Sequence, residues 1–171
     1  MKKTLLVSLL AFSALLANPL VLENGMIKAH TEVFGDSHIE PSTKAITSHL
    51  TIGEDIGSMG GSIDVSVNRL KSDNTRRDEH MDEALDVARY PLAHYTFRKV
   101  TPSGIDGILE FHGVKHPLHI DARITDNGKT VTIHGKSHIS LADYKVKPIK
   151  LLLLTVRDRI DLLIDVTLKK K

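Results

Sequence analysis

Apolar and polar residues alternate with a period of two along most of the chain. Successive side chains of a β-strand point to opposite sides, so each alternating segment predicts a strand with one apolar and one polar face. Glycine, proline, asparagine and aspartate separate the segments, as turns require, and Asp126-Asn127-Gly128 predicts a tight turn. The apolar positions form eight groups: Ile27, Ala29, Thr31, Val33; Ile46, Ser48, Leu50, Ile52; Ile63, Val65, Val67; Tyr95, Phe97; Leu109, Phe111; Leu118, Ile120, Ala122, Ile124; Val131, Ile133, Ile139; and Ile160, Leu162, Ile164, Val166, Leu168.

Strands with a single apolar face do not suit a parallel sheet that is covered on both sides. The pattern therefore predicts an all-β protein, either an antiparallel barrel or a sandwich. Eight strands can close into a barrel whose interior is filled by side chains or holds one slender ligand. A sandwich would instead pack its two inner faces together without a cavity.

One segment, Ser72 to Pro91, departs from the alternation and predicts a helix. Thr75 is in position to cap the first turn. The negative charge of Asp78, near the N-terminus of the helix, interacts favourably with the positive end of the helix dipole. Pro91 stops the helix. The predicted apolar face consists of Met81, Ala84, Leu85 and Ala88. A single short amphipathic helix among strands suggests a lid at the mouth of a barrel.

The N-terminus has the pattern of a secretory signal peptide. Lys2 and Lys3 precede an apolar run of 12 residues, Leu5 to Leu16, and cleavage is expected after Ala17. Because a membrane span needs about 20 residues, an uncleaved anchor is the weaker alternative. Residues 18–171 then form a single domain without a membrane span, exported to the periplasm of a diderm bacterium.

Composition limits the classes of function. Removing Lys2 and Lys3 with the signal peptide leaves 21 basic and 21 acidic residues, so no basic surface for nucleic acid is expected. Cysteine is absent, which excludes disulfides and thiol catalysis. No GxSxG motif is present. We therefore expect a protein that is not an enzyme, with a hydrolase built from scattered Ser, His and Asp as a remote alternative.

Ten histidines raise the question of a metal site. His112, His116 and His119 lie close in sequence, and His134 and His138 share one face of a predicted strand. Without cysteine or an HExxH motif, we expect most of these side chains to be exposed polar residues, and no metal or other cofactor. A second irregular feature is the run Leu151 to Leu154, which could line the pocket mouth, form a homodimer contact or be a buried strand edge.

Several short motifs in a fixed order resemble the YceI-like family of exported proteins, also called polyisoprenoid-binding and lipocalin-like. These motifs are Leu70–Asn74, Arg77–Met81, Tyr90–Pro91, Tyr95–Phe97, His112–Leu118, Asp143–Tyr144 and Val156–Leu162. The segment from Met26 to Gly61 lacks the aromatic-rich opening strands that are common in the family, which predicts a differently shaped pocket.

This resemblance implies an extended eight-stranded antiparallel lipocalin-like barrel with one short helix near its mouth. It also implies that the barrel holds an amphiphile with a long chain, such as an isoprenoid, an isoprenoid quinone or a fatty-acid derivative. Members of the family are regarded as carriers or sequestering proteins rather than enzymes, and some are linked to stress responses. A metal-binding or stress-response barrel without a lipid pocket is the alternative function.

The apolar strand faces supply the predicted lining of such a pocket. Its members are Ile63, Val65, Val67, Phe97, Leu109, Phe111, Leu118, Ile120, Val131, Ile133, Ile139, Leu162 and Ile164. The predicted contacts to a polar head group are Arg76, Arg77, Asp78 and His80, close to the expected mouth. For the helix residues, ordinary capping and surface ion pairs are the competing interpretation.

Overall fold

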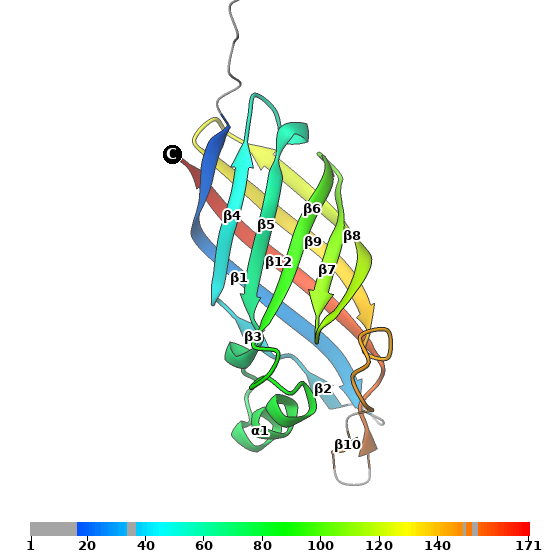
Figure 1. Ribbon diagram of the computed structural model, residues 1–171. Helices are drawn as coiled ribbons and strands as arrows, with labels where there is room; N and C mark the ends of the chain where they lie inside the picture. The colour runs from blue at the N-terminus through cyan, green and yellow to red at the C-terminus, as the bar shows by residue number, and fades with distance from the viewer. Residues whose placement is uncertain (1–16, 34–36, 149, 152–153) are drawn as a thin grey trace, which may run out of the picture.

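Eight antiparallel strands close into a barrel (Figure 1). The computed structural model describes residues 17–33, 37–148, 150–151 and 154–171, so the predicted signal peptide lies outside it except for Ala17. The strands are β1 (Asn18–Val33), β2 (Ser37–Ile39), β3 (Ser42–Thr43), β4 (Ile46–Ile52), β5 (Gly60–Ser66), β6 (Leu92–Thr101), β7 (Gly104–Phe111), β8 (Val114–Asp126), β9 (Thr130–Ser140), β10 (Lys150–Leu151), β11 (Leu154–Thr155) and β12 (Arg159–Lys170). The helices are the 3-10 turns η1 (Ile56–Ser58) and η2 (Val67–Arg69) and the α-helix α1 (Thr75–Ala84).

The order of the barrel strands is β12-β9-β8-β7-β6-β5-β4-β1, and β1 also pairs with β12. That last pairing joins the two ends of the chain, for example Ile27 opposite Ile164. A closed sheet has no free edges, so the sandwich alternative is excluded and the predicted lipocalin-like barrel is confirmed. β10 and β11 form a separate two-stranded sheet. The side chains of Leu151 to Leu154 lie outside the described residues, so the hypotheses for this run stay predictions.

Two hairpin turns follow directly from local sequence. His112 and Gly113, between β7 and β8, both have positive φ angles, 49° and 74°, as a tight turn of the mirror-image type requires. Asp126 and Gly128 form the turn between β8 and β9, where the aspartate carboxylate accepts a hydrogen bond from the glycine N–H at 2.8 Å. The predicted Asp-Asn-Gly turn is therefore confirmed.

The interior of the barrel differs between its two ends. At the end away from α1, large apolar side chains fill the interior and do not border the cavity that lies toward α1. Those with at most 2% of their surface exposed include Leu20, Leu50, Ile52, Val131 and Leu168. This end of the barrel is solid, and the remaining interior volume lies toward α1.

The helix differs from its prediction in length and in its cap. α1 ends at Ala84, well before Pro91, because Asp86 adopts a left-handed conformation with φ 45°. The N-cap is Asn74 rather than Thr75: its side chain accepts a hydrogen bond from the N–H of Arg77 at 3.0 Å. Ala88 lies beyond the helix and is exposed, so it is not part of the apolar face. In a smaller correction, Val67 belongs to η2 and not to a strand.

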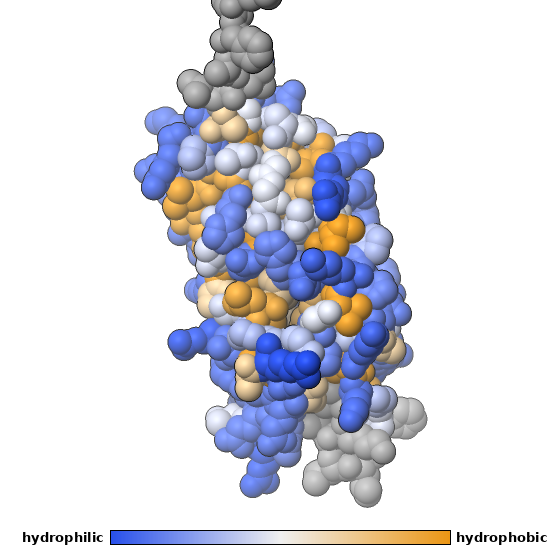
Figure 2. Space-filling model, in the orientation of Figure 1, coloured by the Kyte–Doolittle hydropathy of each residue, from blue (hydrophilic) through white to orange (hydrophobic). Residues whose placement is uncertain are grey.

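The outer surface is mostly polar. Figure 2 shows hydrophilic side chains over most of the visible wall and over the outward side of the α1 region, with apolar side chains in separate spots. The large apolar side chains exposed within the described residues are Val21, Leu92 and Leu163. No helix in the described part of the chain is long and apolar enough to cross a membrane.

Candidate functional site

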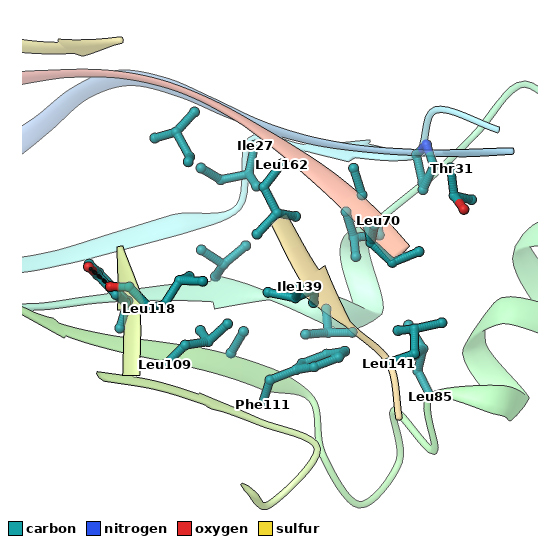
Figure 3. A pocket seen from close by; sticks show the side chains of 18 of the residues that line it. Ile27, Thr31, Leu70, Leu85, Leu109, Phe111, Leu118, Ile139, Leu141 and Leu162 are labelled. Atoms are coloured by element: carbon teal, nitrogen blue, oxygen red, sulfur yellow. Dashed lines mark hydrogen bonds between the residues drawn. The ribbon is translucent and has the colours of Figure 1, made fainter. Parts of the chain in front are cut away.

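A cavity of about 200 Å³ lies inside the barrel and extends to the end next to α1 (Figure 3). Side chains from β1, β5 to β9 and β12 form its wall. Met81 of α1 and Leu85, the residue that follows the helix, border one end. Ile105, Leu109 and Phe111 on β7 all line it. At about 3.3 Å per residue these three span about 20 Å of strand, so the cavity is long and narrow.

The structure brings together all but one of the predicted lining residues. Those that border the cavity are Ile63, Val65, Val67, Phe97, Leu109, Phe111, Leu118, Ile120, Ile133, Ile139, Leu162 and Ile164. Val131 does not border it. It points inward as predicted, but it lies in the solid half, where it stands opposite Leu168 and is 0% exposed.

Other lining residues did not figure in the prediction. Ile27 and Ala29 belong to the alternating face of β1, and the same argument that selected β5 and β12 would have found them. Ile39, Leu141 and Val156 have no such signal. Ile39 lies in β2, which has only three residues, and the other two lie outside the strands. A periodic pattern cannot identify contacts of that kind.

Polar groups at the cavity wall are bonded to the protein. The Tyr95 hydroxyl donates to the carbonyl oxygens of Ile105 (3.1 Å) and Leu118 (2.9 Å), and burial, followed by the charge of Asp106, raises the pKa of this phenol above its ordinary value. The Thr31 hydroxyl donates to a backbone carbonyl of β12 at 3.3 Å. Because these hydroxyl groups form hydrogen bonds with the protein backbone, the surface that faces a ligand in the cavity is apolar.

Of the predicted head-group residues, Arg77 and Asp78 border the cavity, whereas Arg76 and His80 are exposed and do not. Asp78 is buried and accepts hydrogen bonds from the N–H (2.8 Å) and hydroxyl (2.7 Å) of Ser72. Arg77 pairs with Asp73 at 2.7 Å, but the Asp73 side chain is 87% exposed. Ion pairs with such an exposed partner contribute little to stability. The Arg77 guanidinium can therefore leave Asp73 and bind another anionic or polar group.

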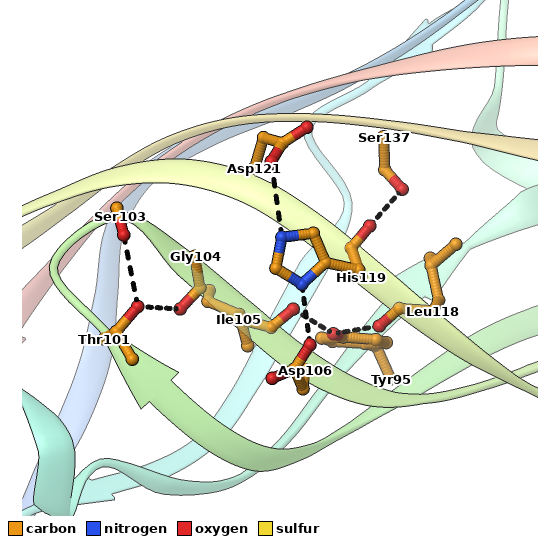
Figure 4. A network of polar contacts seen from close by, with 10 residues as sticks. All are labelled: Tyr95, Thr101, Ser103, Gly104, Ile105, Asp106, Leu118, His119, Asp121 and Ser137. Carbon is orange, nitrogen blue, oxygen red and sulfur yellow. Dashed lines mark hydrogen bonds and ion pairs between the residues drawn. The ribbon is translucent and has the colours of Figure 1, made fainter.

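His116, His119 and His134, three of the histidines considered from sequence, have separate partners (Figure 4 shows His119). His119 pairs with Asp106 at 2.6 Å and with Asp121 at 3.3 Å. His134 pairs with Asp165, and His116 donates to the Asp143 carbonyl at 2.9 Å. These side chains do not converge on one point. A different set within the described residues, His30, Glu32 and His38, does bring potential ligand atoms together.

Comparison with known proteins agrees with this architecture. The model of the YceI-like domain family matches residues 25–168. None of the curated proteins matches the chain. Several solved structures are similar, among them the following three. Burkholderia cenocepacia BcnA has 14% identity and a TM-score of 0.72, over 84% of this chain and 95% of that one.

A polyisoprenoid binding domain from Saccharophagus degradans, implicated in plant cell wall breakdown, has 10% identity and a TM-score of 0.70, over 90% of this chain and 99% of that one. The Campylobacter jejuni YCEI protein has 16% identity and a TM-score of 0.53, over 100% of this chain and 94% of that one. At these identities the structures establish a shared fold. Together with the match over residues 25–168, the closed barrel and its cavity show that the chain belongs to the YceI-like domain family.

Proposed function

We propose that this protein binds an amphiphile with a long chain, such as an isoprenoid, an isoprenoid quinone or a fatty-acid derivative, inside the barrel. The observation that carries the proposal is the narrow cavity, about 200 Å³ in volume, with an apolar wall whose polar groups are bonded internally. The similar domain from Saccharophagus degradans, described as polyisoprenoid binding, supports the same ligand class. Binding by burial requires no reactive group, so the proposed role is not enzymatic.

The binding energy comes from removing the chain of the ligand from water. A chain that buries about 300 Å² of apolar surface gains about 7.5 kcal/mol at roughly 25 cal/mol per Å², from which the cost of association is subtracted. A charged molecule would lose its hydration in this apolar space, and a bulky molecule would not fit, so neither gains a comparable binding energy. The cavity therefore selects a slender apolar chain.

The two ends of the barrel orient this ligand. Since the end that contains Leu20 and Leu168 is solid, the tail enters from the α1 end and the head group stays there. Arg77 borders the cavity at that end and is the residue placed to contact an anionic or carbonyl head group. α1 and the residue that follows it serve as the lid, with Met81 and Leu85 over the tail.

Location and biological role are part of the proposal. The N-terminal pattern supports export to the periplasm with cleavage after Ala17, and β1 begins at the next residue, Asn18. A carrier or sequestering role between membranes suits a protein that holds its ligand without covalent bonds. N-terminal sequencing of the periplasmic protein should begin at Asn18; an intact Lys2 and Lys3 would contradict export by cleavage.

Extraction of the untagged protein with organic solvent, followed by mass spectrometry, tests the ligand directly. A reproducible amphiphile is expected. The double variant Leu109→Trp/Ile139→Trp should lose it, because two indole rings occupy the cavity. Leu163→Trp is the matched control, since Leu163 points outward and is 37% exposed. Absence of any amphiphile from the wild type, or its retention in the folded double variant, would refute this pocket.

The contribution of Arg77 is tested by a pair of neighbouring arginines. Arg77→Gln should weaken binding of a fatty acid but not of the corresponding neutral alcohol, since only the acid carries a charge for the guanidinium. Arg76→Gln should change neither affinity, because Arg76 is exposed away from the cavity. Equal effects of the two substitutions would show that Arg77 makes no specific head-group contact. Fluorescence displacement of a bound probe lipid measures both affinities.

A further inference from the structure

The outer face of the β1–β2 hairpin carries a cluster of two imidazoles and one carboxylate. His30 and Glu32 are two residues apart on β1 and so point to the same side, and Glu32 stands opposite His38 in the β1–β2 pairing. One potential ligand atom from each of these three side chains lies within 4.8 Å of the other two. The two imidazole rings are stacked, with centroids 5.3 Å apart.

Residues around the cluster resemble the outer shell of a metal site. A histidine that binds a metal through one ring nitrogen usually donates a hydrogen bond from the other ring nitrogen, often to a carboxylate. Here Glu40 Oε1 lies 3.1 Å from His30 Nδ1, and Lys28 pairs with the same glutamate at 3.3 Å. Arg157 pairs with Glu32 through Oε2. A carboxylate has two oxygens, so this pair does not exhaust Glu32 as a ligand.

We propose that His30, Glu32 and His38 bind one Zn²⁺ ion on the outer face of β1 and β2. Two imidazoles and one carboxylate suit zinc, with water in the fourth position, whereas Mg²⁺ and Ca²⁺ require more oxygen ligands. In tetrahedral zinc sites the ligand atoms are about 3.4 Å apart. The separations of up to 4.8 Å therefore close by small rotations of side chains that are exposed or half-buried.

The zinc ion would link β1 and β2, which are otherwise held together by a short strand pairing. β2 pairs with β1 through only three residue pairs. On the opposite side of β2, the buried side chain of Ile39 forms part of the cavity wall. A zinc ion bound by His30 and His38 would hold β2, and with it Ile39, against the barrel. The effect on the protein is therefore stabilisation at the α1 end.

Isothermal titration of the untagged protein with ZnCl2 tests the site, because a histidine tag would add ligands. One Zn²⁺ per chain is expected, and His30→Gln and His38→Gln should each lower the affinity by at least about tenfold. His134→Gln is the matched control, since His134 is an exposed histidine on the outer face of β9, paired with Asp165 and outside the cluster. Glu32→Gln, of the same size, should also weaken binding.

A second measurement separates loss of the site from loss of the fold. Without metal, the variants should melt close to the wild-type temperature because the replaced side chains are exposed or half-buried and lie outside the apolar core. Zn²⁺ should raise the melting temperature of the wild type and of His134→Gln but not of His38→Gln, and MgCl2 should have no effect. The proposal is overturned if no stoichiometric zinc binds, if the His30→Gln/His38→Gln double variant keeps its affinity, or if His134→Gln weakens it equally.

Discussion

Position along the barrel determines how much a single leucine contributes to stability. Leu168 and Leu162 both point inward from β12, but Leu168 is 0% exposed in the solid half, whereas Leu162 borders the cavity. Leu168→Ala should lower the free energy of unfolding by about 2 to 5 kcal/mol, because it opens a void among packed side chains. Leu162→Ala should lower the free energy of unfolding by clearly less, because the side chains around Leu162 already border the cavity.

Urea unfolding of lipid-free protein measures both values. The comparison requires protein without ligand, because a bound chain would fill the space beside Leu162. Equal costs for the two substitutions would mean that the cavity is not open in the free protein.

His119 is paired with two neighbouring carboxylates that affect its pKa (Figure 4). Its pKa lies above the ordinary histidine value, chiefly through the hydrogen bond to Asp106 and to a smaller degree through Asp121. Because the pKa is higher in the folded state, these pairs stabilise the fold at pH values below the unfolded-state pKa. That stabilisation is lost as the pH rises through the folded-state value.

Asp106→Asn should therefore lower the His119 pKa more than Asp121→Asn does. NMR titration of the imidazole protons measures both values. The reverse order would show that Asp121 is the dominant partner.

Among the elements, α1 depends on its first turn. Asn74 caps the helix through the N–H of Arg77, while Thr75 is exposed and does not serve as the cap. Asn74→Ala should destabilise the helix by about 1 kcal/mol, and Thr75→Ala should have much less effect. Hydrogen exchange of the α1 amides reports the local opening of the lid. Similar exchange in the two variants would contradict the assignment of the cap.

At the scale of the whole molecule, ligand binding and stability are linked. A ligand that binds only the folded barrel stabilises it by about 2.7 kcal/mol at a concentration of 100 times its Kd. Lipid-free protein should consequently melt at a lower temperature than protein saturated with the amphiphile. Calorimetry measures the difference. In the Leu109→Trp/Ile139→Trp variant the same amphiphile should produce no shift, and a shift there would place binding outside the cavity.

Local sequence was sufficient for much of this architecture. The alternation correctly predicted the inward face of β12, and the Asp-Asn-Gly segment predicted a hairpin turn. The family motifs predicted a barrel, which the β1–β12 pairing confirms. The same alternation failed for Val131, because it distinguishes inside from outside but carries no information on depth along the barrel. It also missed Leu141 and Val156, which reach the cavity from irregular segments.

The sequence by itself determined which side chains point into the barrel, because the direction of a side chain in a strand is set by its own backbone. Tertiary structure decided where the barrel is solid and where it is hollow, since that depends on how eight strands are staggered when β1 meets β12. It also decided which polar groups meet. His30 and His38 are eight residues apart in sequence, and only the register of β1 against β2 places both beside Glu32.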